Sequence, residues 1–181
     1  DAVNAGYRLD RIYRIGHHGK DLLPPALGVL EHKTIEPGVI LEDGELKITA
    51  YVGEHPPIEP AVGYRFDYRG RSVVISGDSN VNDNTLKIVD GADLLLHDAL
   101  SLPTTSALAN ALGAAGQSRQ SQIVTDVLDY HASTDSLVEL GEKSNVGMVA
   151  FYHLVPVPPT ALLKDVFLRG APDNFLLTED L

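Results

Sequence analysis

The sequence predicts a mixed α/β fold in which helices pack on a sheet. Two hairpin patterns come first along the chain, and strand patterns alternate with helix patterns after them. This alternation is typical of domains in which helices cover a sheet. The chain has 181 residues, 44% of them hydrophobic and 22% charged, which suffices for a globular domain with a sizeable core. We therefore expect a single α/β domain over residues 1–181.

Two β-hairpins are expected in the first half of the chain. In each, two runs of β-prone residues flank a dipeptide that ends in glycine, which tolerates the positive φ of a two-residue turn. The first hairpin joins residues 38–42 to residues 45–51 through Asp43-Gly44, and the second joins residues 62–68 to residues 71–76 through Arg69-Gly70. Before them, RIGHHGKD (residues 14–21) is expected to form a polar loop.

Helix and strand patterns alternate from residue 82 onward. The runs ADLLL (residues 92–96) and VGMVAFY (residues 146–152) are uninterrupted and apolar, as is typical of buried strands. The expected helices follow Ser, Thr or Asn residues that can cap a first turn. They run from Asn82 or Asn84 to Val89, over residues 105–115, from Ser118 or Ser121 to Leu128, from Ser133 or Thr134 to about Asn145, and over residues 161–168.

The composition restricts the classes of function. The formal net charge is −11, from 14 basic and 25 acidic residues, so nucleic acid is disfavoured as a partner. The chain has no cysteine, which leaves histidine and carboxylate as the ligands for any metal ion. No apolar run approaches the roughly 20 residues of a membrane span. We expect a soluble protein without a membrane partner, in the cytoplasm or the periplasm.

Several predicted strands end at a residue that can bind a metal ion. VVIS leads to Asp78, ADLLL to His97-Asp98 and VGMVAFY to His153, while His55 follows an earlier strand and His131 lies between two helices. Because ligand sites gather beyond the carboxyl ends of parallel strands, these residues are candidates for one shared site. The alternatives are an Asx turn at Asp78 and structural hydrogen bonds at the histidines. No short-range His-x-His or His-x-x-x-His pattern occurs.

Five segments, taken in order, resemble the metallo-β-lactamase-fold hydrolases, above all their ribonuclease Z and arylsulfatase-like branch. The segments are GEHPPIEPAVGYRF, SVVISGDS, GADLLLHDAL, YHASTDSLVELGEKSNV and MVAFYHLVP. The similarity extends from about Tyr7 to about Phe167. It implies part of a four-layer αββα sandwich, namely its C-terminal half together with the preceding hairpins.

The resemblance also implies roles for single residues. His55, Asp78 and His153 match metal ligands, and the carboxylate of Asp78 matches a bridge between two ions. His131 matches the histidine that stabilises the transition state or donates a proton, so Asp78 and His131 are the expected catalytic residues. His97-Asp98 matches a pair that supports the ligands. The implied cofactor is a pair of zinc ions, with manganese or iron as alternatives, and the implied chemistry is hydrolysis by a metal-activated water.

One part of the family pattern is absent. The motif His-x-His-x-Asp-His does not occur in the sequence, and in the family it lies upstream of the stretch that matches Tyr7 onward. The chain also begins at Asp1 rather than at Met, as a processed product or a fragment does. We therefore expect the C-terminal portion of a hydrolase, with either a missing N-terminal half or a homo-oligomer as its partner. Alone, it is expected to be poor in metal and inactive.

Three functions are compatible with these patterns. The first is hydrolysis of a small ester, sulfate ester, phosphodiester or lactone, because apolar loops follow His55 and His153. The second is a non-catalytic or split-chain module that keeps the fold and binds a partner polypeptide. The third is a ribonuclease Z-like RNA endonuclease. The tight hairpin over residues 64–77 and the acidic charge favour a small-molecule substrate over RNA.

Overall fold

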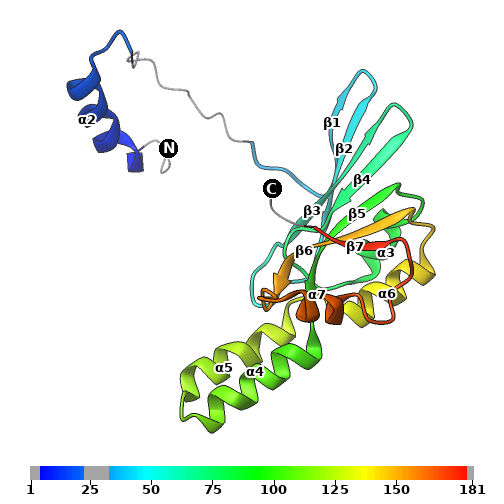
Figure 1. Cartoon of the computed structure of the whole chain (residues 1–181). Coiled ribbons are helices and arrows are strands. Elements are labelled where there is room, and N and C mark those ends of the chain that lie inside the picture. Colours follow the sequence, from blue (N-terminus) through cyan, green and yellow to red (C-terminus); the bar gives the residue numbers. More distant parts are fainter. Residues whose placement is uncertain (1–4, 23–32, 179–181) are drawn as a thin grey trace. The chain divides into compact units, whose positions relative to one another are not determined.

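The computed structural model describes residues 5–22 and 33–178, which belong to two compact units, Asp1–Ile35 and Glu36–Leu181 (Figure 1). In the first unit, α2 (Arg8–His18) places His17 and His18 in the last turn of a helix. The expectation of a polar loop over residues 14–21 is therefore wrong for its first part. Gly19, with φ of 84°, ends the helix. The single domain over residues 1–181 stays a prediction.

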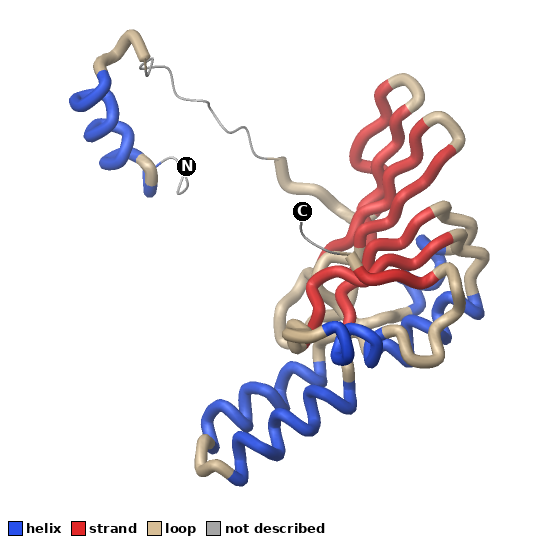
Figure 2. The backbone as a smooth tube through the Cα atoms, viewed as in Figure 1, coloured by secondary structure: helices blue, strands red, loops and turns tan. Residues whose placement is uncertain are grey.

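The second unit is built on a seven-stranded sheet (Figure 2). Its strands lie side by side in chain order, antiparallel from β1 to β4 and parallel from β4 to β7. Both predicted hairpins are confirmed, and Gly44 and Gly70 supply the positive φ of the turns. The strands are β1 (Gly38–Asp43), β2 (Leu46–Val52), β3 (Val62–Tyr68), β4 (Arg71–Ile75), β5 (Leu94–Leu100), β6 (Met148–Val155) and β7 (Phe175–Leu177).

The helices of this unit confirm the predicted alternation. The side chain of Asn82 accepts hydrogen bonds from the backbone of Asn84 and Thr85, and Ser133 caps its helix in the same way. Two helices extend from the end of β5 as a hairpin, α4 (Leu102–Ala114) and α5 (Ser118–Asp126), in Figure 1. The others are α3 (Asp83–Val89), the 3₁₀ turn η1 (Val127–Asp129), α6 (Thr134–Lys143) and α7 (Ala161–Phe167). Helices of the length and apolar character that a bilayer crossing requires are absent from the described residues.

The core lies between one face of the sheet and helices α3, α6 and α7. Val74, Leu95 and Val149 are paired across neighbouring strands and are completely buried. They pack with Val89, Leu137, Leu140 and Phe167 of the helices. We call this side the helix-covered face.

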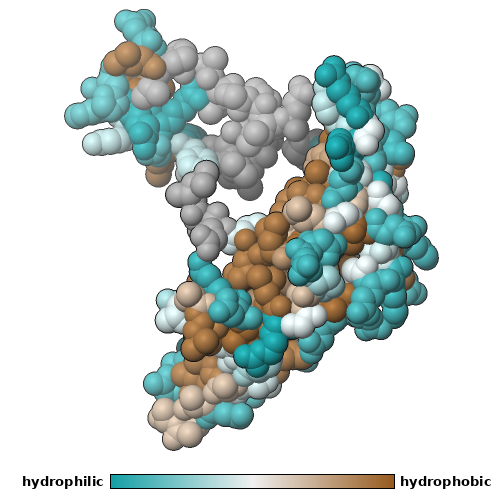
Figure 3. Space-filling model, turned by 45° about the vertical axis from the view of Figure 1, so that its right-hand side comes forward, coloured by the Kyte–Doolittle hydropathy of each residue, from teal (hydrophilic) through white to brown (hydrophobic). Residues whose placement is uncertain are grey.

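The opposite side of the sheet is also apolar, and we call it the open face. Side chains alternate between the faces of a strand, so two rows of cross-strand partners point to this side. One row is Ile48, Phe66, Val73, Leu94 and Met148, and the other is Ala50, Tyr64, Ile75, Leu96, Ala150 and Leu176. Apart from Ala50 and Ala150, these residues are partly exposed or exposed. Apolar residues accordingly reach the surface of this unit in a broad band (Figure 3).

The predicted fold class is confirmed by this architecture. One sheet with helices on one face forms two of the four layers of an αββα sandwich, and the antiparallel hairpins precede its parallel part.

Candidate metal centre

Four of the predicted site residues converge near the carboxyl ends of β2, β4 and β6: His55 and Asp78 follow β2 and β4, His153 lies within β6, and His131 precedes α6. The carboxylate of Asp78 lies at their centre. Its Oδ2 is 3.4 Å from Nε2 of His55 and 3.6 Å from Nε2 of His153, and its Oδ1 is 2.8 Å from Nδ1 of His131. The sheet thus brings together all the residues that were expected to bind metal or to act in catalysis. Their roles in those processes stay predictions.

Asp78 reaches this position because the backbone turns sharply at Gly77, after β4. Gly77 has φ of 74°, and a Cβ there would lie 2.9 Å from the carbonyl oxygen of Val62. The hydroxyl of Tyr152 donates a hydrogen bond to the carbonyl of Gly77 at 3.0 Å. The backbone of Asn80 bonds to that of Glu54 at 2.7 Å, which ties the loop of Asp78 to the loop that carries His55.

His153 is presented by an irregularity in β6. Tyr152 pairs with Asp98 and Leu154 pairs with Ala99, so His153 is an extra residue without a partner on β5. Its φ of 45° lies in the left-handed region, which is uncommon for a residue other than glycine. The bulge turns the imidazole toward Asp78 and leaves about half of this side chain exposed.

Asp98 supports the centre through its contact with His131. It is completely buried, and its Oδ2 lies 3.1 Å from Nδ1 of His131 and accepts a hydrogen bond from the backbone of Ala132. Burial alone raises the pKa of Asp98, but hydrogen bonds from His131 and His97 outweigh it and lower the pKa to about 2. Because both neighbours of Nδ1 of His131 are carboxylates, this nitrogen carries the proton. The sequence analysis expected His97-Asp98 to support the metal ligands, but it did not predict that Asp98 would contact His131.

Tyr130 is a neighbour of the centre that the sequence analysis missed. Its ring centroid lies 4.6 Å from that of His55 and 4.9 Å from that of His131. Burial raises the pKa of Tyr130, and the charges of Asp126, Asp78 and Asp129 raise it further. The only signal in the sequence was that Tyr130 precedes His131.

The donors suit a metal ion that prefers nitrogen and oxygen ligands. Donor atoms of Asp78, His131 and His153 lie within 4.8 Å of one another. Nδ1 of His55 is buried without a hydrogen-bond partner among the described residues, while its Nε2 faces Asp78. Imidazole and carboxylate donors are typical of zinc sites and also accept manganese or iron. By donor type, the residues fit the expected ion.

Comparisons with known proteins identify the fold. No family model matches the chain. The structure is similar to the metallo-β-lactamase fold protein YhfI from Bacillus subtilis, with a TM-score of 0.52 and 16% identity over 77% of this chain and 49% of that one. The chain is also 29% identical to ribonuclease Z of Mycolicibacterium gilvum (strain PYR-GCK), over 83% of its own length and 48% of the relative. The chain therefore has the metallo-β-lactamase fold.

The chain is also similar to a second ribonuclease Z and to two further solved structures. Ribonuclease Z of Mycobacterium avium (strain 104) is 29% identical over 82% of this chain and 48% of its own length. Zinc-bound PqqB from Methylobacterium extorquens has a TM-score of 0.54 and 16% identity, over 93% of this chain and 57% of its own. A diphosphatase from the PhnP family has a TM-score of 0.53 and 19% identity, over 93% and 52%. The chain spans about half the length of the curated relatives it matches, which fits the predicted C-terminal portion.

Proposed function

We propose that this chain carries part of the active site of a metal-dependent hydrolase that cleaves a small phosphodiester or a related ester. The observation that carries the proposal is the placement of Asp78, with two imidazoles facing one carboxylate oxygen and a third facing the other. Such a carboxylate is suited to bridge metal ions. Ester, sulfate ester and lactone substrates share the same chemistry.

Each residue of the centre then has a role. His55, Asp78 and His153 would hold the metal, which by donor type would be zinc and in the complete enzyme a pair of ions. A bound ion of this kind lowers the pKa of a water molecule and polarises the bond to be cleaved. His131 is positioned by Asp98 through Nδ1, so its Nε2 can exchange a proton with the leaving group.

Three observations favour phosphodiesters of small size. The matched relatives are ribonuclease Z proteins, and one similar structure is a diphosphatase. The exposed residues Glu54, Glu59, Asp126 and Asp129 line the two cavities next to the centre, and their negative charge disfavours a long nucleic-acid backbone. The turn between β3 and β4 is short as well, with only Arg69 and Gly70 between the two strands.

The test is the substitution Asp78→Ala in the complete enzyme, with Asp173→Asn as a control at the other end of the sheet. We expect Asp78→Ala to lose bound metal, measured by elemental analysis. Hydrolysis of bis(4-nitrophenyl) phosphate should fall by more than about 100-fold, the upper range for residues that only support metal ligands. Normal metal content and turnover in Asp78→Ala would refute the proposal. A parent protein without metal and without turnover would favour the partner-binding module.

An RNA endonuclease is the second candidate, because the curated relatives are ribonuclease Z proteins. The same preparations decide between the two when they are given a tRNA precursor. Faster cleavage of the precursor than of the small diester, sensitive to Asp78→Ala, would establish the endonuclease.

A further inference from the structure

A cavity of about 580 Å³ adjoins the candidate metal centre on the side of Tyr130. It is lined by Pro56, Pro57, Ile123, Asp126, Asp129 and Tyr130. We call it the Tyr130 cavity.

The Tyr130 cavity shares a wall with the centre. The ring of Tyr130 lines the cavity and lies against the rings of His55 and His131. Pro56 and Pro57 directly follow His55 in the chain. The side chain of Asn80, two residues after Asp78, donates a hydrogen bond of 2.7 Å to the carbonyl of Asp129. A substituent on a substrate held at Asp78 therefore has this cavity as a neighbour.

The lining combines apolar walls with negative charge. Proline, isoleucine and tyrosine side chains form the walls, and the charges belong to Asp126 and Asp129. No lysine or arginine is among the described residues that line it. The carboxylate of Asp126 accepts a hydrogen bond from the uncharged side chain of Gln122, so this bond leaves its charge in place. An aromatic face with nearby carboxylates favours a cation that carries apolar groups.

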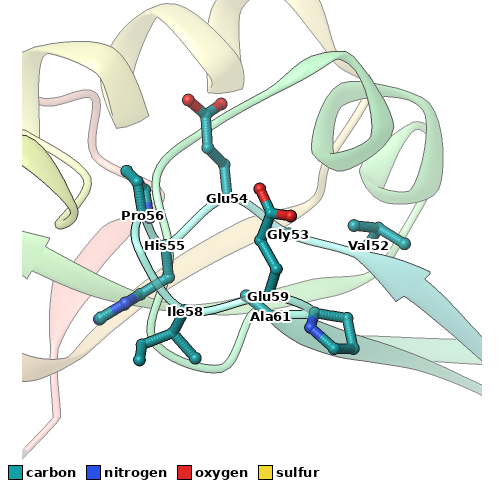
Figure 4. Close-up of a pocket in the computed structure, with 9 residues that line it drawn as sticks. Val52, Gly53, Glu54, His55, Pro56, Ile58, Glu59 and Ala61 are labelled. Carbon is teal, nitrogen blue, oxygen red and sulfur yellow. The ribbon is translucent and has the colours of Figure 1, made fainter.

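A second cavity, of about 560 Å³, lies along residues 52–61 and is less suited to this task. Figure 4 shows that Glu54 and Glu59 extend to one side of the loop, while the imidazole of His55 points to the other. Among the described residues, its lining contains no phenylalanine, tyrosine or tryptophan. Glu54 and Glu59 give this cavity negative charge, but it lacks the tyrosine ring that lies against both His55 and His131.

We propose that the Tyr130 cavity binds a cationic apolar group of the substrate, of the alkylammonium or quaternary ammonium class. The inference rests on the proposed function, because the group belongs to the molecule that is hydrolysed at the neighbouring centre. Asp126 and Asp129 select the charge, while Tyr130, Ile123 and the prolines accommodate the alkyl groups.

Binding without turnover is the first test. Choline and its uncharged analogue 3,3-dimethyl-1-butanol differ in charge but hardly in shape, and NMR shifts of the Tyr130 ring report their binding. We expect choline to bind about tenfold more tightly, as two partly screened carboxylates allow. Asp126→Asn with Asp129→Asn should abolish that preference. Glu142→Gln with Asp173→Asn, which removes the same charge near the start of β6, should keep it.

Turnover separates this inference from the proposed function. The substrates are 4-nitrophenyl phosphorylcholine and 4-nitrophenyl 3,3-dimethylbutyl phosphate, and we expect the first to have a kcat/KM about tenfold higher. Equal binding of choline and its analogue, no binding of choline, or a preference that survives Asp126→Asn with Asp129→Asn would overturn the inference. Selective choline binding without hydrolysis of either diester would refute the proposed function and leave the cavity's selectivity established.

Discussion

Both faces of the strands β4 to β6 carry apolar side chains, but the two faces differ in burial. Leu94 and Leu95 are neighbours on β5 with the same side chain, yet Leu95 is completely buried on the helix-covered face while Leu94 is partly exposed on the open face. An apolar surface of several strands is more than a soluble monomer usually exposes. The apolar run ADLLL therefore places side chains suited to burial on both faces of β5. In a four-layer sandwich a second sheet covers the open face.

The largest expected effect tests this difference directly. Leu95→Ala should lower the free energy of unfolding by about 2–5 kcal/mol, because it removes packing from a closed core. Leu94→Ala should cost less than about 1 kcal/mol, since water already reaches that side chain. Urea denaturation of the two variants provides the measurement. Equal losses would mean that the open face is covered in solution.

A smaller effect on stability is expected at Asp98, whose charged side chain is completely buried in β5. The pKa of Asp98 is about 2 in the folded protein, below its ordinary value of 3.8. The stability that it contributes is therefore complete above about pH 4 and lost as the pH falls toward 2. Asp98→Asn should remove about 2 kcal/mol of the pH dependence of unfolding in that window. Glu142→Gln is the control, and an unchanged pH dependence in Asp98→Asn would contradict the assignment.

The smallest effect on stability is expected for Leu41 and Met148, which lie on the side of the open face. Leu41 and Met148 are each 42% exposed, so Leu41→Lys with Met148→Lys should change the unfolding free energy by only about 0.5 kcal/mol. The same substitutions should weaken self-association, because they place charge on the uncovered apolar surface. Sedimentation velocity over a range of concentrations measures this. A parent chain that is monomeric at every concentration would argue against an uncovered face.

Local signals made much of the fold predictable. Asp43-Gly44 and Arg69-Gly70 specify their turns through backbone geometry alone, and Asn82 caps α3 as expected. The missed elements carried weak signals. β7 has only three residues, and the glycines at 16 and 19 obscured the helical pattern of α2.

The sequence indicated which residues make up the candidate site, but it did not indicate which of them contact one another. His55, Asp78, His131 and His153 stand out by chemistry, by position after strands and by the family resemblance. Contacts that depend on pairing between distant segments could not be read from the chain. Asp98 meets His131 only because β5 ends beside the start of α6, and Tyr130 reaches His55 through the fold of η1.

The left-handed backbone at His153 lowers the stability of the fold, whereas its imidazole contributes to the candidate metal centre. A glycine or an asparagine would adopt a φ of 45° at lower cost than histidine does. Only histidine, however, offers Asp78 an imidazole from this bulge. Exchange of His153 for glycine should therefore raise the free energy of unfolding while it removes the imidazole that faces Asp78.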